Sequence, residues 1–533
     1  MTTRHPQNLD FNEQFARAYG LMENGQQNLF ITGKAGTGKS TLLQYFRANT
    51  RKNVAVLAPT GVAAVNVKGQ TIHSFFGFKP DITPVAVRAI RVGKTRKMMY
   101  QKLEAIIIDE ISMVRADLLD CVDAFLRSRG PCADAPFGGV QMIFIGDLYQ
   151  LPPVVGAAER AVFGGGNGKT MYRSPYFFDA KVLEDFQAEV VELEKIYRQK
   201  DDDFIGLLNA VRNNSVTEEH LKVLNSRCIP DFTPGTDELY IHLTTTNDLA
   251  NRINEQRLNA LPGRTSRYEG RMTGDFDFKS LPTQEILCLK TGAQVMLLNN
   301  DPGGRWNNGS LGKIIAIEKD AEDPDIIRVE LTDGDEVEVS PYTWEMFRFF
   351  YNEKTGTLDS EEVGSFTQYP LRLGWAVTIH KGQGKTFSRI IVDIGRGTFA
   401  HGQMYVALSR CTSLEGLVLK KPILKKHILM DWRVVKFMTG YQYRRAEELY
   451  PLDRKRKILE QAIEDEKAVD IVYLKAGDEK TRRTIGPRAV GEMEYLGKTY
   501  LGVEAYCFKR KDIRAFRLDR ILEIRESASP LKR

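Results

Sequence analysis

The stretch NLFITGKAGTGKS, from Asn28 to Ser40, decides the fold of this chain. Its first half is an apolar, strand-like run, and its second half, Gly33 to Ser40, fits the pattern G-x-x-x-x-G-K-[ST]. Glycines let successive backbone N–H groups wrap a phosphate, and a helix that begins at Ser40 directs its positive end at the same group. The stretch therefore predicts a strand, a phosphate-binding loop and a helix, with a nucleoside triphosphate as the ligand.

The segments around this loop alternate apolar strands with helical patterns. The runs NVAVLAP, EAIIIDE and VQMIFIGD begin at Asn53, Glu104 and Val140. Continuous apolar runs bounded by turns are typical of buried parallel strands in a doubly wound α/β sheet. The runs LYIHLTTT (239–246) and RIIVDIG (389–395) repeat the pattern, so we expect a second α/β lobe.

Polar residues at the ends of these runs predict nucleotide hydrolysis. Lys39 neutralises charge on the β- and γ-phosphates, and the Ser40 hydroxyl ligates the Mg²⁺ that accompanies ATP. Asp109 and Glu110 end a strand, where open α/β sheets bind their ligands. We expect Asp109 to hold Mg²⁺ through water and Glu110 to orient or deprotonate the attacking water. Gln150, after the next strand, can hydrogen-bond the γ-phosphate.

Length and composition indicate a soluble protein of several domains. The chain has 533 residues, which is too many for one hydrophobic core, and 42% of them are hydrophobic. No apolar run reaches the roughly 20 residues of a membrane span, and the six cysteines are scattered, as in a reduced cytoplasmic protein. The net charge is +6, with a basic surplus after Pro451. This surplus permits a polyanionic partner, but composition alone favours a solvated basic surface.

Eight strings occur in order along the first four-fifths of the chain. They are GKAGTGKST, APTGVAAVNVKGQTIHSFF, IIIDEISMV, GDLYQLPPV, YRQKDDDFIGLLNAVR, TTTNDLANRIN, LRLGWAVTIHKGQGKTF and GQMYVALSRC. Between about Leu9 and Leu419 the chain thereby resembles the superfamily-one helicases of the PIF type (petite integration frequency). A RecD-like or relaxase-associated helicase is the alternative within the same class, and the TIHSFF and LPPV strings favour the PIF type.

The resemblance implies two RecA-like P-loop lobes that clamp ATP, with an SH3-like β-barrel inserted in the second. It implies 5′-to-3′ movement along single-stranded DNA and the unwinding of duplex, forked or structured DNA. We expect lobes at 1–185 and 186–430, with a wedge insertion near 77–100 and the barrel near 311–366. Short antiparallel-type runs with Gly/Asp turns support the barrel. We expect a monomer in the cytoplasm, associated with the nucleoid and without a membrane partner.

The resemblance also assigns residues to the nucleotide. Gln14 reads the adenine, Arg198 and Arg410 reach the γ-phosphate, and Gln383 with Gly384 couples nucleotide to DNA. The expected nucleotide contacts are Gln14, Gly33, Ala35, Gly36, Thr37, Gly38, Lys39, Ser40, Thr41, Gln383 and Gly384, and the expected catalytic residues are Lys39, Glu110, Gln150, Arg198 and Arg410.

A second set of residues is expected on the DNA strand: Thr60, Gly61, His73, Asn247, Asn308, Thr378, His380 and Lys381. Small polar groups of this kind bind a phosphate backbone without sequence preference. The two histidines could instead belong to the core. Phe75 and Trp375 could stack on bases, but core packing is the more frequent role of such residues.

The tail resembles a WYL domain, a small SH3-like barrel of bacterial regulators. We expect helices over 431–466 and the barrel over 467–533, with Tyr500 and Leu501 in the name-giving tripeptide and Thr499 in place of its tryptophan. The residues expected to hold a nucleic acid or nucleotide-like ligand are Tyr500, Tyr506, Arg514, Arg517 and Arg520. Planar guanidinium groups suit phosphates and base edges, although one of these arginines could serve only as an ion-pair partner. An alternative function follows, in which the tail is a regulator and the ATPase its conformational switch.

Overall fold

The computed structural model describes residues 11–156, 159, 162–163, 171–184, 188–235, 238–319, 324–395, 397–398, 400–475, 478–495 and 497–530. They form two compact units, Met1–Asn209 with Thr217–Leu429, and Ala210–Val216 with Met430–Arg533. None of the described helices combines the length and the apolar character that crossing a bilayer demands.

The first lobe is built on a parallel sheet of six strands in the order β3-β2-β4-β5-β1-β6. Its strands are β1 (Asn28–Gly33), β2 (Val54–Ala58), β3 (Gln70–Thr71), β4 (Ala105–Ile108), β5 (Gln141–Ile145) and β6 (Ala188–Leu193). Its helices are α1 (Glu13–Asn24), α2 (Lys39–Asn49), α3 (Gly61–Asn66), α4 (Ile72–Phe76), α5 (Pro84–Val87), α6 (Lys94–Gln101) and α7 (Ala116–Arg129). The doubly wound sheet expected from the apolar runs is confirmed. It extends past residue 185, where we expected the lobe to end, because β6 pairs along the full length of β1.

Burial explains why these strands read as continuous apolar runs. Every residue of β4 and β5 is buried, since helices cover both faces of the sheet. Leu42 and Phe46 of α2 share a core with Ile31 of β1 and Ile143 of β5. The phosphate loop between β1 and α2 therefore rests on rigid elements at both ends.

The second lobe has its own parallel sheet, of four strands in the order β18-β7-β19-β20. These strands are β7 (Ile241–Thr244), β18 (Ala376–Thr378), β19 (Ile390–Asp393) and β20 (Leu417–Leu419). The helices of this half of the chain are α8 (Asp202–Arg212), α9 (Glu218–Asn225), α10 (Asn247–Ala260) and α11 (Gln403–Leu408). The expected second α/β lobe is confirmed.

A β-rich insertion separates α10 from β18. Its strands are β8 (Ser266–Glu269), β9 (Arg271–Gly274), β10 (Ile286–Leu289), β11 (Gln294–Leu297), β12 (Leu311–Glu318), β13 (Ile326–Leu331), β14 (Glu336–Val339), β15 (Tyr342–Asn352), β16 (Thr357–Gln368) and β17 (Leu371–Leu373). Five of them form the antiparallel sheet β14-β13-β12-β11-β17. The insertion is thus wider than the expected 311–366, because strands of only three or four residues at its edges give too short a pattern to recognise.

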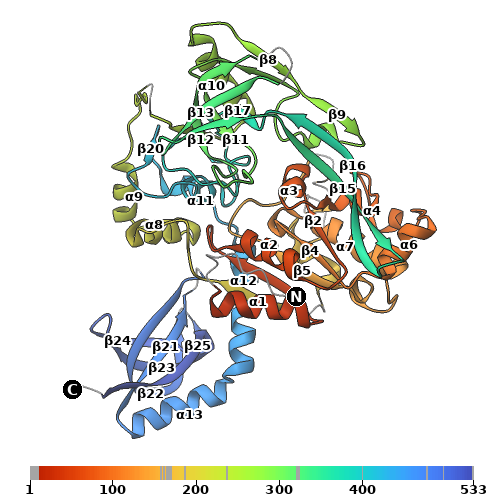
Figure 1. Cartoon of the computed structure of the whole chain (residues 1–533). Coiled ribbons are helices and arrows are strands. Elements are labelled where there is room, and N and C mark those ends of the chain that lie inside the picture. The colour runs from red at the N-terminus through yellow and green to blue at the C-terminus, as the bar shows by residue number, and fades with distance from the viewer. Residues whose placement is uncertain are drawn as a thin grey trace. The chain divides into compact units, whose positions relative to one another are not determined.

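The hairpin of β15 and β16 extends from this insertion to the first lobe, where it lies beside α4 and α6 (Figure 1). The backbone N–H of Phe349 donates to Gln70 Oε1 at 3.2 Å, and that of Leu358 donates to Asn53 Oδ1 at 2.6 Å. The Phe349 ring also meets Phe75 edge to face. The insertion therefore contacts both lobes.

The second unit is dominated by an antiparallel sheet of five strands in the order β24-β23-β22-β21-β25. Its elements are α12 (Trp432–Leu449), α13 (Leu452–Glu464), β21 (Lys467–Leu474), β22 (Lys480–Tyr495), β23 (Lys498–Cys507), β24 (Asp512–Arg517) and β25 (Ile521–Pro530). Leu459 and Ala462 of α13 pack on Val469, Ile485 and Val503 of the sheet. The helix expected to be a linker therefore completes the core of this unit.

Leu459→Ala should lower the free energy of unfolding of the second unit by about 2–5 kcal/mol, because it removes a fully buried side chain and leaves a cavity. Calorimetry or urea denaturation measures this. The control is Ile513→Ala on β24, whose side chain is exposed and whose loss should change stability by about 0.5 kcal/mol or less. Equal effects of the two substitutions would contradict the assignment of α13 to this core.

Candidate active site

The phosphate loop has the backbone geometry that its glycines predict. Gly36 and Gly38 have φ angles of 81° and 88°, in the left-handed region that favours glycine. A Cβ on Gly36 would lie 2.5 Å from the Cβ of Arg198, so that position also has no room for a side chain. Lys39 Nζ donates to the carbonyl oxygens of Gly33 and Lys34, at 2.7 and 3.0 Å. These two hydrogen bonds fix the position of the Lys39 ammonium group at the phosphate loop.

A cavity of about 490 Å³ opens over this loop, and both lobes contribute to its wall. It is lined by Phe15, Ala35, Gly36, Thr37, Gly38, Lys39, Ser40, Thr41, Asp109, Glu110, Gly146, Gln150, Tyr197, Arg198, Gly384 and Arg410. This volume is typical of a small-molecule site. The structure thus brings together the residues that the sequence assigned to phosphate, Mg²⁺ and hydrolysis.

Two aromatic rings in this wall escaped the sequence reasoning, and Gln14 lies differently than expected. Tyr197 is 43% exposed, and its hydroxyl accepts a hydrogen bond from Asn12 Nδ2, next to Phe15. These rings offer an apolar face to a nucleobase. Gln14 is not among the lining residues. Its side-chain nitrogen donates to Glu194 Oε2, and its side-chain oxygen accepts from the backbone N–H of Glu194 at 3.0 Å.

The acidic pair follows β4 directly. Glu110 has a φ angle of 51°, and strained backbone of this kind in a residue other than glycine is concentrated at functional sites. Burial, together with the neighbouring Asp109 carboxylate, raises the pKa of Glu110, and burial also raises the pKa of Asp109. A carboxylate with a raised pKa at the wall of the cavity suits the role of general base.

A glutamine from the second lobe contacts the hydrolytic position directly. Gln383 Nε2 donates to Glu110 Oε2 at 3.1 Å and to Gln150 Oε1 at 3.3 Å. Gln150 in turn donates to Asp147 Oδ2 at 3.3 Å. One short polar chain therefore joins the two lobes at the place where water would attack.

The two predicted arginines lie side by side although 212 positions separate them. Arg198 donates to the carbonyl oxygens of Ser409 and Gly384, at 3.2 and 3.1 Å. Arg410 is 1% exposed and donates to the carbonyl of Lys385 at 3.2 Å. Burial, followed by the nearby charge of Arg198, lowers the pKa of Arg410 to about 9. Both groups remain cationic at neutral pH, and a bound polyphosphate would offset their charge.

A second cavity, of about 450 Å³, lies in the second lobe. It is lined by Thr245, Thr246, Asn247, Asp248, Thr378, His380 and Lys381. Four of the predicted DNA contacts therefore share one hollow. Burial lowers the pKa of His380, which keeps its ring neutral at physiological pH. Small polar groups and one lysine suit a phosphodiester backbone.

Asn308 lies in the insertion. Lys385, a residue that the sequence did not single out, connects it to the cavity over the phosphate loop. Lys385 Nζ donates to Asn308 Oδ1, while the backbone carbonyl of Lys385 accepts from Arg410. Asn308 Nδ2 in turn donates to Asn66 Oδ1 of the first lobe at 3.4 Å. Lys385 therefore contacts both Arg410, which lines the first cavity, and a predicted DNA contact.

The predicted DNA contacts of the first lobe lie on α3 and α4 or at the start of α3. The Thr60 hydroxyl caps α3 by accepting from the N–H of Ala63 at 3.3 Å. A Cβ on Gly61 would lie 1.8 Å from Ser280 Oγ, so the insertion approaches closely there. Burial, followed by the charge of Arg115, lowers the pKa of the half-buried His73.

The two aromatic candidates for base stacking belong to cores. Phe75 is 1% exposed and meets the rings of Phe76 and Tyr100 edge to face. Trp375 packs against the core of the insertion. Core packing, which the sequence favours for Phe75 over base stacking, is therefore what the structure shows, because the ring is almost fully buried.

The predicted tail residues occupy β23, β24 and the turn after it. The guanidinium of Arg517 lies 5.1 Å from the centre of the Tyr500 ring and forms an ion pair with Asp519 at 2.6 Å. Arg514 stands opposite Ala505 on the neighbouring strand. One of the three arginines thus has the ion-pair partner that the sequence reasoning left open.

Comparisons with known proteins show which family the chain resembles. The family model of PIF1-like helicases matches residues 12–222, and the WYL domain model matches residues 455–526, beginning within α13. The chain is similar to a human ATP-dependent DNA helicase PIF1, with 35% identity over 73% of this chain and 58% of that protein. It is similar to the Pif1 of Bdellovibrio bacteriovorus, with 33% identity over 81% of this chain and 93% of the relative.

Among solved structures, the Pif1 of a Bacteroides species in complex with ADP-AlF4 is similar to this chain. The TM-score is 0.73 and the identity 37%, over 81% of this chain and 97% of the other. The chain thus spans nearly all of these two bacterial proteins and little more than half of the human one.

Glu110→Gln should preserve the affinity for ATP and lower its hydrolysis by about 10²–10⁴-fold, because the amide keeps the shape of the side chain but cannot accept a proton. Equilibrium binding of a fluorescent ATP analogue and phosphate release measure the two effects. The control is Glu104→Gln, which removes a carboxylate just before the other end of β4, where Glu104 Oε2 accepts from the N–H of Asn53. Normal turnover in Glu110→Gln would remove Glu110 from the catalytic residues.

Proposed function

This chain belongs to the PIF1-like helicase family, and we propose that it is an ATP-dependent DNA helicase that moves 5′-to-3′ along single-stranded DNA. One observation carries the proposal: the segment 378–385 serves both cavities. Thr378 and His380 line the second-lobe hollow, while Gln383 donates to Glu110 in the nucleotide cavity. A movement of Gln383 caused by hydrolysis of the γ-phosphate would therefore reach the residues that bind the DNA strand, which lie only a few positions away in the same segment.

The chemistry at the nucleotide is phosphoryl transfer to water. Lys39 and the loop N–H groups bind the β- and γ-phosphates, Glu110 takes a proton from the attacking water, and the two arginines stabilise the charge that develops. An arginine in this position contributes about 10³–10⁵ in rate. Gln150 orients the γ-phosphate or the water through the same polar chain.

The residues present fit Mg²⁺. Ser40 offers a hydroxyl and Asp109 a carboxylate in the same cavity, and both are the oxygen donors that Mg²⁺ prefers. Among the described residues no three His, Cys, Asp or Glu side chains form a cluster that could bind a metal by themselves, which agrees with an ion held mainly by water and phosphate. When bound, Mg²⁺ neutralises the phosphates of ATP.

The strand lies, in this proposal, across both lobes and the insertion. Asn247, His380 and Lys381 bind it on the second lobe, Thr60 and His73 on the first, and Asn308 from the insertion. Closure of the lobes on ATP and their reopening after hydrolysis then advance one set of contacts past the other. Forked and structured DNA are the substrates we propose, and the nucleoid is the place of action.

We propose a monomer as the translocating species. The name of one similar solved structure describes DNA unwinding at forked double-stranded DNA by two coordinating Pif1 helicases, so two monomers acting at one fork are compatible with this proposal. The view that the ATPase serves only as a switch for the tail is not favoured, because a switch needs no second set of DNA contacts linked to Glu110.

Strand separation should require a 5′ single-stranded tail. We expect the purified chain to unwind a duplex with a 5′ overhang and to leave the same duplex with a 3′ overhang intact, with ATP hydrolysis raised by single-stranded DNA. A gel-based unwinding assay with both substrates measures this. The matched control is the Lys39→Ala variant, which should bind DNA but unwind neither. No stimulation of hydrolysis by single-stranded DNA would contradict the proposed function.

We also propose that the tail arginines bind nucleic acid and so modulate the motor. Arg514→Glu with Arg517→Glu should flatten the slope of log affinity against log salt, by roughly 1 for each phosphate that the variant no longer binds. The control is Arg482→Glu with Arg525→Glu, which changes the net charge equally at two exposed positions of the same sheet. Fluorescence anisotropy with labelled single-stranded DNA gives the slopes, and equal slopes for the two double variants would contradict the assignment.

A further inference from the structure

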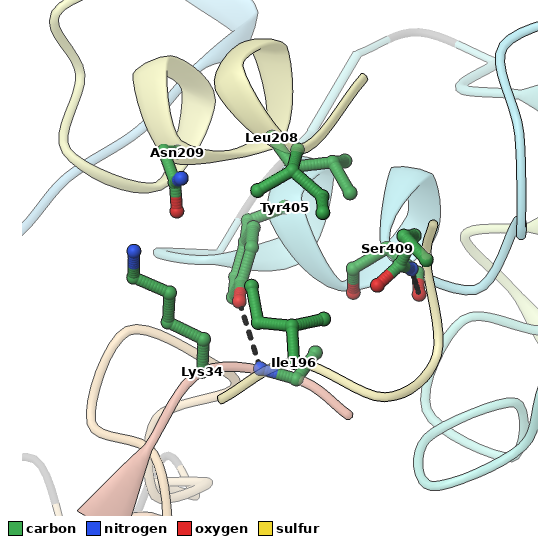
Figure 2. Close-up of a pocket in the computed structure, with 9 residues that line it drawn as sticks. Lys34, Ile196, Leu208, Asn209, Tyr405 and Ser409 are labelled. Atoms are coloured by element: carbon green, nitrogen blue, oxygen red, sulfur yellow. Dashed lines mark hydrogen bonds between the residues drawn. The ribbon is translucent and has the colours of Figure 1, made fainter. Parts of the chain in front are cut away.

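A tyrosine of the second lobe forms a hydrogen bond directly into the phosphate loop. Tyr405 lies on α11, is 3% exposed, and its hydroxyl accepts from the backbone N–H of Ala35 at 3.0 Å. The dashed line in Figure 2 marks this bond. Ala35 is the third residue of the loop and is 5% exposed. The bond therefore joins two elements that are 370 residues apart and both buried.

The hollow around this bond is too small for a ligand. It has a volume of about 10 Å³, roughly that of a single water-sized probe, and its walls include Ile196, Leu208 and Tyr405 itself. Figure 2 shows the tyrosine ring between the loop at Lys34 and the side chain of Leu208. The place is a packed contact between the lobes, and the hydrogen bond from Ala35 to the phenol oxygen is one of its polar contacts.

The Ala35 N–H needs an acceptor in either state of the lobes. A buried backbone N–H without a partner is costly, so nearly all of them are paired. In the cycle of the proposed function, water can satisfy this N–H when the lobes are apart, and the phenol oxygen satisfies it when they are closed. The bond consequently stabilises the closed state alone, because the open state satisfies the same donor without it.

Tyr405 is tied to both arginines at the nucleotide. The residue after it, Val406, accepts from Arg410 Nε at 2.9 Å. At the end of the same helix, the carbonyl of Ser409 accepts from Arg198 at 3.2 Å and from Gln199 at 3.1 Å. A shift of α11 away from Ala35 would move all of these partners together.

We propose that Tyr405 is a positioning residue for ATP hydrolysis, whose hydroxyl binds the phosphate loop on closure and so sets Arg198 and Arg410 against the γ-phosphate. The proposal rests on the proposed ATPase activity. It assigns no proton transfer to the phenol, whose oxygen accepts the hydrogen bond from Ala35.

Tyr405→Phe tests this, because it keeps the ring and removes the acceptor. We expect DNA-stimulated kcat/KM for ATP to fall by about 5- to 100-fold, the range for leaving a buried donor unsatisfied. The affinity for ADP with aluminium fluoride, which mimics the closed transition state, should fall by a similar factor. The affinity for ADP alone, which needs a folded loop but no closure, should stay as in the wild type.

The matched control is Tyr369→Phe in the insertion. Tyr369 is also buried, and its hydroxyl donates to the carbonyl of Asp325, so the same atom is removed away from the nucleotide. This variant should lower the melting temperature and leave kcat/KM unchanged.

Wild-type kcat/KM in Tyr405→Phe would overturn the proposal, and so would an equal loss of ADP affinity, which indicates general damage to the loop. Either result leaves the ATPase activity of the wild type intact. A wild-type chain without DNA-stimulated hydrolysis would instead overturn the proposed function itself.

Discussion

The nucleotide cavity depends on the contacts of one short helix. All six residues of α11 are buried, and the helix is held at its beginning, middle and end. Before it, His401 lies 3.1 Å from the carbonyl of Leu148, and Gly402, at a φ angle of 71°, packs against the backbone oxygens of residues 149 and 150. In the middle Tyr405 accepts from the phosphate loop, and at the end Gln199 donates to the carbonyls of Ser409 and Cys411. These contacts hold Arg410 and the carbonyl partner of Arg198 beside the first lobe.

The segment from residue 383 to residue 385 forms hydrogen bonds that could couple the two cavities. The carbonyl of Lys385 accepts from Arg410, and its ammonium group donates to Asn308 in the insertion. A few residues earlier, Gln383 contacts Glu110. Direct hydrogen bonds therefore link Glu110 and Arg410, at the first cavity, to the segment that holds the proposed strand contacts.

Much of this could be predicted from local sequence. The glycine loop, the acids after β4 and the two sets of apolar strands each have a pattern complete within ten residues, and the structure places them as the pattern predicts. The edges of the insertion could not be found, because β11 and β17 are too short to show an alternation. The roles of α13 and Phe75 follow from packing partners that spacing alone cannot identify.

Hydrogen bonds between residues that are far apart in the sequence could not be predicted either. Tyr405 pairs with Ala35, and Lys385 with Asn308, across distances in sequence that no local pattern spans. Gln14 was assigned from a resemblance, while its amide pairs with Glu194, which depends on where β6 ends. Each of these contacts forms only when two distant segments pack together in the folded chain. It can therefore be known only from the structure or from a resemblance to a known family.

Closure of the two lobes around the nucleotide is the central claim, and the distance between the lobes tests it most directly. One spin label can be placed on Cys132, which is exposed in the first lobe, and another on a cysteine introduced for Val223, which is exposed on α9. Double electron–electron resonance then gives the distance distribution with and without ADP and aluminium fluoride, with single-stranded DNA present. The account predicts a broad distribution that becomes narrow and shorter when the analogue binds. A distribution that the analogue leaves unchanged would contradict it.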